Sequence, residues 1–318
     1  MNTRNSLLLG GSGGVPILNA SGCLDALAAP EVARTLDAFV TKTITPLPRA
    51  GNRPVRIAET EHGMLNSIGL QGPGIDAFLE SHLPRLGLLG LPIWVSVGGF
   101  SAADFALMCQ ALDGCDAVTA VELNLSCPNV DDAPETSAQL VAAARAATRK
   151  PLFAKLSPAT RDLAESARAV AAAGADGLSL VNTIRGLALD ERTLAPRLGT
   201  ALGGYSGPAL KPIALAAVYA CATAVELPIV GMGGIATGRD ALELVAAGAS
   251  AVALGTVLFA DPDAPVRIRA ELAGEASGHG YADPSAARGV VHRMDHIGDS
   301  LSSPDSQKPL QKDRKVPA

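Results

Sequence analysis

The sequence is poor in aromatic residues and lacks an excess of positive charge. Phe, Trp and Tyr make up 3% of the 318 residues, too few for the stacking surfaces that bind single-stranded nucleic acid. The 31 acidic and 26 basic residues give a net charge of −5, which offers no general attraction for a phosphate backbone. These two features exclude nucleic acid as an expected partner.

The sequence also lacks paired cysteines and long apolar runs. The five cysteines form no CxxC pair, and the five histidines show no metal-ligand spacing. We therefore expect no disulfide framework, iron–sulfur cluster or metal site within this chain. The longest uncharged apolar stretches, Ile213–Val225 and Ser250–Ala260, are shorter than the ~20 residues that span a bilayer. The Leu7-Leu8-Leu9 run is too short for the core of a signal peptide, so we expect a soluble, cytoplasmic protein.

What the chain does have is an alternation of short apolar runs and alanine-rich stretches. Hydrophobic residues make up 48% of the sequence, enough for a sizeable core. The apolar runs lack strict polar alternation, which is typical of parallel strands covered on both faces. The expected strands are Ile17–Ala20, Phe39–Thr43, Ile93–Val97, Val118–Leu125, Leu152–Leu156, Gly177–Val181, Ile229–Met232 and Ala251–Gly255. The expected helices are Glu31–Ala38, Gly74–Leu86, Ala102–Leu112, Thr136–Thr148, Ala159–Ala173, Ala209–Val225 and Arg239–Ala247.

Eight strands with intervening helices predict an α/β fold. We expect a single (β/α)₈ TIM barrel over residues 1–298, followed by a polar, disordered tail over 299–318. An open doubly wound sheet uses the same units, but eight strands are many for an open sheet. Three segments interrupt the alternation, and we interpret them as long loops over the C-terminal mouth, where a barrel carries its chemistry. They are Thr45–Leu70, Cys127–Glu135 and Ile184–Gly207.

Glycine-rich loops follow the last two expected strands. The segment Ile229–Ile235 reads Ile-Val-Gly-Met-Gly-Gly-Ile, and Gly255-Thr256 follows the eighth strand. At these places in a barrel, backbone N–H groups and a helix N-terminus approach a phosphate. The loops therefore indicate a phosphorylated cofactor or substrate, although tight turns between strand and helix also use glycine.

Asparagines lie in or just after several other segments that end at the expected mouth. An amide offers both a donor and an acceptor, so several amides together match a planar ring or a small carboxylate. Any one asparagine at a strand end also serves as a turn or helix cap. The four candidates are Asn66, Asn124, Asn129 and Asn182.

Two lysines and one cysteine complete the candidate site. Lys42 and Lys155 lie in apolar strands, where a lysine needs an anion or a hydrogen-bond acceptor. Pairing with a substrate carboxylate, contacting an electron-rich cofactor and forming a Schiff base are all open to them. Cys127 follows a strand in the polar segment Ser126–Asn129, a setting in which a thiol can take a proton.

Seven ordered segments give the sequence a specific resemblance. They are Ala20–Cys23, Gly63–Gln71, Leu123–Val130, Phe153–Pro158, Leu180–Thr183, Ser206–Pro212 and Ile229–Ile235. In order and spacing they resemble the class 1 dihydroorotate dehydrogenases, FMN-containing barrels of pyrimidine synthesis. The resemblance covers residues 15–295 and implies oxidation of (S)-dihydroorotate to orotate.

The resemblance also implies roles for individual positions. Cys127 would take a proton from C5 of dihydroorotate, while the C6 hydride passes to FMN. The positions implied for substrate are Lys42, Asn66, Ser67, Ile68, Gly69, Leu70, Asn124, Asn129, Asn182 and Thr183. Those implied for FMN are Ser21, Lys42, Thr43, Asn124, Lys155, Val181, Gly207, Gly233, Gly234, Gly255 and Thr256, the last four around its phosphate.

Two of these segments, Gly63–Gln71 and Gly231–Ile235, are most similar to the 1B type. That type passes electrons to a second subunit carrying FAD and a [2Fe–2S] cluster, and then to NAD, in a heterotetramer of two plus two. The chain has no cysteine cluster of its own, so this path implies a partner. One position departs from the family pattern, because Ser96 stands where the family often has an asparagine that touches FMN.

Several other functions remain as alternatives. They are a 1A-like homodimer using fumarate, a related FMN barrel acting on another pyrimidine, a catalytically silent subunit, and a barrel lyase with a Schiff base on Lys155.

Overall fold

A computed structural model of the chain describes residues 14–125 and 136–293, so Cys127, Asn129 and the expected tail lie outside the described residues. Eight parallel strands form its centre, in the order β1-β12-β11-β8-β7-β6-β5-β2. Each of them lies within a run that the sequence predicts as a strand. Their bounds are β1 Ile17–Asn19, β2 Phe39–Val40, β5 Ile93–Val97, β6 Val118–Asn124, β7 Leu152–Lys155, β8 Gly177–Leu180, β11 Ile229–Met232 and β12 Ala251–Leu254.

The two ends of this strand order meet and close the sheet into a barrel. Leu18 of β1 forms a parallel bridge with Ala38, immediately before β2. The buried Asn19 side chain completes the seam: it donates to the Val40 carbonyl and accepts from the Val40 N–H, both at 2.8 Å. The expected barrel is therefore confirmed, and the open doubly wound sheet is wrong.

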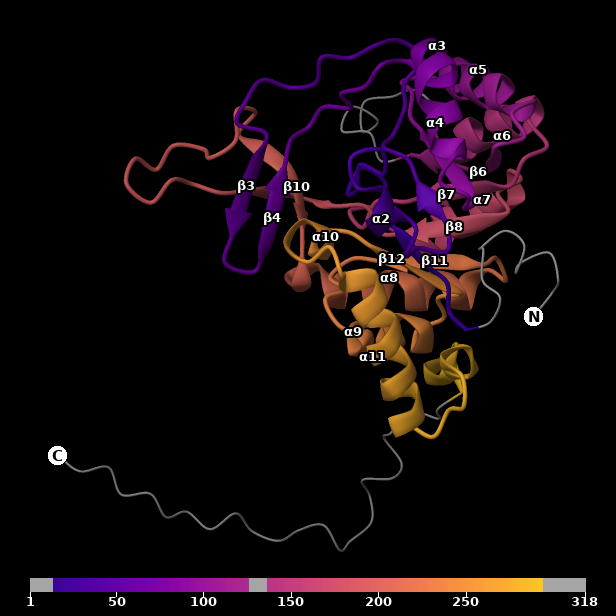
Figure 1. Cartoon of the computed structure of the whole chain (residues 1–318), viewed down its shortest axis with the longest axis vertical. Helices are drawn as coiled ribbons and strands as arrows, with labels where there is room; N and C mark the ends of the chain where they lie inside the picture. The colour runs from indigo at the N-terminus through magenta and orange to yellow at the C-terminus, as the bar shows by residue number, and fades with distance from the viewer. Residues whose placement is uncertain (1–13, 126–135, 294–318) are drawn as a thin grey trace, which may run out of the picture.

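Helices cover the outside of the barrel (Figure 1). Within residues 14–125 and 136–293, no helix combines the length and apolar character needed to cross a membrane. The longer helices are α5 Ala102–Asp113, α6 Ser137–Ala147, α7 Leu163–Ala172, α8 Lys211–Ala224, α9 Gly238–Ala246 and α11 Ala264–Gly278. The shorter ones are α2 Pro30–Ala33, α3 Ile75–Ala77, α4 Leu83–Gly87 and α10 Val257–Ala260.

Three of the expected helices differ in detail from the structure. The helix predicted over Glu31–Ala38 ends at Ala33 as the short α2, and Ala38 instead forms the bridge to Leu18. The helix predicted over Gly74–Leu86 is divided, because a π-helical turn over Phe78–His82 separates α3 from α4. The helix predicted from Ala159 begins only at Leu163, since the Asp162 side chain accepts a hydrogen bond from the backbone N–H of the first turn and caps the helix there.

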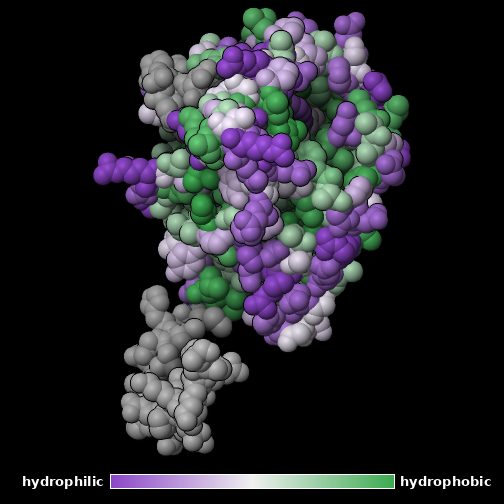
Figure 2. All heavy atoms as spheres, turned by 90° about the vertical axis from the view of Figure 1, so that its left-hand side faces the viewer, coloured by the Kyte–Doolittle hydropathy of each residue, from purple (hydrophilic) through white to green (hydrophobic). Residues whose placement is uncertain are grey.

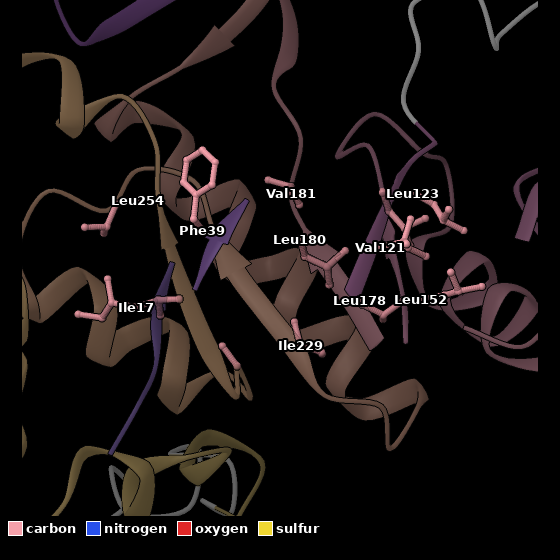
Figure 3. Close-up of a cluster of buried hydrophobic side chains, with 14 of the residues drawn as sticks. Ile17, Phe39, Val121, Leu123, Leu152, Leu178, Leu180, Val181, Ile229 and Leu254 are labelled. Carbon is pink, nitrogen blue, oxygen red and sulfur yellow. The ribbon is translucent and has the colours of Figure 1, made fainter. Parts of the chain in front are cut away.

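Buried side chains lie in two layers because they alternate along each strand. Outward-facing strand residues such as Val121 and Leu123 of β6 pack with the helices in the larger cluster (Figure 3). Inward-facing residues fill the barrel interior, where the rings of Trp94 and Phe153 lie 4.3 Å apart. On β6 this alternation turns Glu122, between two outward-facing residues, into the barrel.

A second, antiparallel sheet of order β3-β4-β10-β9 lies against the barrel mouth (Figure 1). β3 (Ile57–Thr60) and β4 (Gly63–Asn66) belong to the segment after β2, whereas β9 (Ile184–Leu187) and β10 (Leu202–Ser206) follow β8. The expectation that both segments are only long loops is therefore wrong. They gain regular structure from pairing between β4 and β10, which are far apart in the sequence.

The small sheet keeps several apolar side chains in solvent. Ile57, Leu187 and Leu202 are 46%, 52% and 47% exposed. Figure 2 views this side of the molecule, where hydrophobic residues lie in patches between hydrophilic ones. Half-exposed strands of this kind have no continuous apolar run, which is why their sequence resembles that of loops.

Candidate active site

A cavity of about 1480 Å³ opens at the C-terminal ends of the barrel strands and against the small sheet. It is larger than a usual small-ligand pocket of about 300–1,000 Å³, so a cofactor and a substrate have room side by side. All the predicted binding residues that the structure describes line this cavity, whereas Cys127 and Asn129 lie outside the described residues. The lining residues are Ser21, Lys42, Thr43, Asn66, Ser67, Ile68, Gly69, Leu70, Asn124, Lys155, Val181, Asn182, Thr183, Gly207, Gly233, Gly234, Gly255 and Thr256.

A buried polar layer formed by three neighbouring strands underlies this cavity. Lys155 of β7 lies with its Nζ 3.5 Å from Oε1 of Glu122 on β6, and it donates to Ser21 Oγ at 3.0 Å. The hydroxyl of Ser96 on β5 donates to the same Glu122 oxygen at 3.1 Å. Glu122 is 1% exposed and Lys155 is 4% exposed. These contacts therefore fix the position of the lysine in a site from which water is nearly excluded.

Sequence analysis missed Glu122, although a carboxylate inside the apolar run Val118–Leu125 is itself a signal. A charged group at such a place is costly to bury unless it is paired. Ser96 is fully buried and lies behind the cavity lining, where it contacts Glu122 and Thr43. Its hydroxyl serves the polar layer, which gives a local reason for a short side chain at the position where the family often has asparagine.

From Ser96 the hydrogen bonds continue along the cavity wall. Thr43 Oγ1 lies 3.0 Å from Ser96 Oγ and accepts from Asn124 Nδ2 at 3.1 Å. Asn124 Oδ1 in turn accepts from Asn182 Nδ2 at 3.1 Å, and Asn182 Oδ1 accepts from the Thr183 N–H at 2.8 Å. These hydrogen bonds set the orientation of both asparagine amides before any ligand binds. The entropy cost of binding a ligand is therefore lower.

The last residue of β4 and the residue after it are held by contacts that the sequence did not predict. The Asn66 amide donates to the Gly204 carbonyl at 3.3 Å. Ser67 Oγ lies 2.5 Å from Thr200 Oγ1 and accepts from Asn52 Nδ2 at 3.0 Å. Pairing of β4 with β10 thus brings Asn66 and Ser67 to the cavity, and it is a tertiary contact that local sequence does not reveal.

Lys42 and Cys23 share the cavity with Lys155. Burial lowers the pKa of the Lys42 ammonium below its usual 10.5; Cys23 opposes this shift and Lys155 adds to it. Burial raises the pKa of the Cys23 thiol above 9.0, although both lysines oppose the shift. Cys23 therefore stays protonated at neutral pH, and the two lysines favour an anionic ligand.

The glycine loops that follow β11 and β12 offer backbone donors to the cavity. The N–H groups of Gly233, Gly234 and Thr256 donate to no acceptor among the residues that the structure describes. Gly233 and Gly234 have φ of +121° and +77°, a conformation that other residues rarely adopt. The glycines thus turn the chain at the cavity and leave backbone donors available to a ligand.

The N-terminus of α9, the helix that follows the first of these loops, is occupied by carboxylates. The Asp240 side chain accepts from the N–H groups of Ala236 and Thr237 at 2.9 and 2.8 Å. Glu271 accepts from the N–H of Gly238 at 2.7 Å. The first turn of α9 is therefore already capped from within the protein, so these N–H groups are not available to a phosphate.

These features together define a barrel with a large cavity at its mouth, lined by two lysines, oriented amides and two glycine loops, which is where barrel enzymes carry their chemistry. A family model described as dihydroorotate dehydrogenase matches residues 10–275. The chain belongs to the dihydroorotate dehydrogenase family, and it is an oxidoreductase of pyrimidine biosynthesis that acts on dihydroorotate.

Individual relatives give the same family. The chain is 43% identical over 290 residues to the dihydroorotate dehydrogenase B (NAD(+)) catalytic subunit of Desulforudis audaxviator, covering 87% of this chain and 94% of the relative. It is 44% identical over 267 residues to a putative dihydroorotate dehydrogenase A (fumarate) of Solibacter usitatus, covering 81% and 88%. A dihydroorotate dehydrogenase crystal structure from Eimeria tenella superimposes with a TM-score of 0.75 at 23% identity, covering 92% and 91%, which supports the fold.

Proposed function

We propose that this chain is the catalytic subunit of an NAD-linked dihydroorotate dehydrogenase that oxidises (S)-dihydroorotate to orotate with FMN. The observation that carries the proposal is the convergence of two lysines, a row of asparagines and two glycine loops in one cavity. No single one of these features is specific, but family membership gives the combination one chemical interpretation.

The donor set of the cavity fits FMN. The backbone of Gly233, Gly234, Gly255 and Thr256 would hold the phosphate. A Cβ at Gly255 would have its nearest neighbours at 3.7 and 3.8 Å, in the cavity-lining residues Ala20 and Cys23, so glycine there keeps the wall open. Lys155 would hold the ring, and when bound FMN supplies the acceptor for the substrate hydride. Further contacts are proposed for Ser21, Lys42, Thr43, Asn124, Val181 and Gly207.

The amides and Lys42 suit the substrate. Dihydroorotate carries a carboxylate, which the Lys42 ammonium can pair with, and a ring whose N–H and C=O groups match amide donors and acceptors. The oriented pair Asn124 and Asn182 would recognise that ring. The remaining proposed substrate residues are Asn66, Ser67, Ile68, Gly69, Leu70, Asn129 and Thr183.

Cys127 is the proposed base. β6 runs toward the cavity and ends at Asn124, shortly before Cys127 in the sequence, so its direction supports a thiolate on the substrate side. The thiolate would take the C5 proton, the C6 hydride would pass to the cofactor, and the thiol would later release its proton to solvent. Holding the substrate between thiolate and cofactor aligns the two transfers and removes the entropy cost of bringing the groups together.

The electrons would leave through a partner. Relatives of this chain are named catalytic subunits, a name that implies a second, separate subunit. We propose that this partner carries FAD and a [2Fe–2S] cluster. The two would form a heterotetramer of two plus two in the cytoplasm. Fumarate is the second candidate acceptor, because a relative at 44% identity is named for it.

Anaerobic reduction tests the proposal directly. The purified chain should be yellow or take up added FMN, and dihydroorotate should bleach its flavin absorbance. Cys127→Ala should retain FMN and slow the bleaching by at least ~10²-fold, whereas Cys115→Ala, at a free cysteine outside the cavity lining, should leave the rate within about twofold. Reoxidation by fumarate alone, or by NAD only with a co-purified partner, identifies the acceptor. A chain that neither holds FMN nor reacts with dihydroorotate refutes the proposal.

A further inference from the structure

The ion pair of Glu122 and Lys155 lies beneath the cavity and at one end of the hydrogen-bonded chain described above. The two groups are 3.5 Å apart and both nearly inaccessible to water. Lys155 also donates to Ser21, and Glu122 also accepts from Ser96. Alternation along β6 gives Glu122 the same inward direction as Asn124, which lines the cavity. The Glu122 carboxylate therefore lies behind Lys155, and the lysine stands between it and the cavity.

We infer that Glu122 is a positioning residue that acts through Lys155 and lowers the reduction potential of the bound cofactor. The inference rests on the proposed function, because it concerns a flavin in this cavity. Two-electron reduction with uptake of one proton adds one negative charge to the flavin. The Lys155 ammonium favours that added charge, and the Glu122 carboxylate opposes it. In a site of low polarity both effects persist over several ångströms.

A stabilising role alone does not account for this pair. Buried ion pairs are often no more stabilising than apolar residues of similar size, because both ions lose their hydration. The arrangement instead gives a lysine that is fixed in direction and partly neutralised. Electrostatic coupling extends across the cavity, because Glu122 and Lys155 both act on Cys23, and Lys155 also acts on Lys42. The consequence is a reduced cofactor that passes its electrons on more readily.

The test is the midpoint potential of the holoenzyme, measured by reductive titration against a reference dye. Glu122→Gln keeps the size of the side chain and an oxygen that accepts from Ser96 and Lys155, but it removes the charge. At a fixed solution potential we expect its ratio of reduced to oxidised flavin to rise roughly tenfold, which is ~30 mV for a two-electron couple. Glu61→Gln is the matched control, because Glu61 is 86% exposed in the turn between β3 and β4 and water screens its charge. It should leave the potential unchanged.

A second variant keeps the inference testable if Glu122→Gln does not fold. Ser96→Ala removes a hydrogen bond to the carboxylate and leaves the ion pair, so the negative charge is less compensated and the potential should fall. Folded, yellow Glu122→Gln protein with the wild-type potential would overturn the inference, as would a rise in Ser96→Ala. A wild-type chain that holds no flavin refutes the proposed function instead, so the two failures are distinct.

Discussion

The two glycines at the ends of β11 and β12 should respond very differently to the same added methyl group. Gly234 has φ of +77°, and a Cβ there would lie 2.6 Å from the backbone nitrogen and 2.8 Å from the Cα of Lys211 at the start of α8. Gly255 has no positive φ, and its added Cβ would have neighbours no closer than 3.7 Å. Both residues line the same cavity, so a difference between the two variants reports on backbone geometry and not on position in the protein.

The magnitude follows from two contributions. An alanine held at positive φ costs about 1–2 kcal/mol. Contacts below 3.0 Å to backbone require α8 to shift, and overpacking of this kind costs about 1–3 kcal/mol. Gly234→Ala should therefore lower the free energy of unfolding by about 2–5 kcal/mol, whereas Gly255→Ala should change it by less than ~0.5 kcal/mol.

Urea unfolding of the FMN-free protein, followed by circular dichroism, measures both variants without any effect of bound ligand. The expected result is a clear fall in the unfolding midpoint for Gly234→Ala with an unchanged slope, and a wild-type curve for Gly255→Ala. Equal midpoints for the two variants would falsify the assignment of a strained, tightly packed turn at Gly234.

Four further predictions concern the barrel and its ionisable groups. Asn19→Ala removes both hydrogen bonds to Val40 across the barrel seam and should lower the unfolding free energy by about 2–4 kcal/mol, measured by urea unfolding. Gly274→Ala in the exposed middle of α11, where an added Cβ has nothing within 4 Å, should raise it by about 0.5–1 kcal/mol; a loss would contradict the open space. Lys42→Met should stabilise the FMN-free protein at neutral pH, because the folded-state pKa of Lys42 lies below 10.5. This gain in unfolding free energy should shrink as the pH rises from the lowered pKa toward 10.5, and then vanish. A gain that grows with pH would refute the prediction. Iodoacetamide at pH 8 should leave Cys23, Cys109 and Cys221 largely unmodified, as measured by mass spectrometry. Burial raises the pKa of the Cys23 thiol, and it raises the pKa values of Cys109 and Cys221 to about 12 and about 11, so little reactive thiolate is present.

The barrel could be predicted from the sequence because each of its strands is a short apolar run buried on both faces. That pattern is local, and it survives in runs such as Ile229–Met232. The small sheet has no such pattern. Its strand β10 reads Leu-Gly-Gly-Tyr-Ser and is partly exposed along its length, and it pairs with β4 only because the barrel brings the two segments together.

The candidate site shows the same division between local and tertiary information. Residue types at strand ends, such as Lys42 and Asn182, are enough to indicate a binding mouth, because the strand ends of a barrel converge. The contacts of those residues depend on neighbours from other strands. Glu122 went unrecognised because its pairing with Lys155 requires the register of β6 against β7.

The segments that form the small sheet leave the barrel from opposite sides. β2 and β8, which precede them, are separated by three strands in either direction around the ring, and β4 joins β10 across the mouth. Each insertion alone would leave the backbone N–H and C=O groups of its inner strand unpaired, and pairing between β4 and β10 supplies the partners for both. Engineers who wish to graft this small sheet onto another barrel must therefore transplant both insertions as a unit, since one of them alone would present an unpaired edge and invite aggregation.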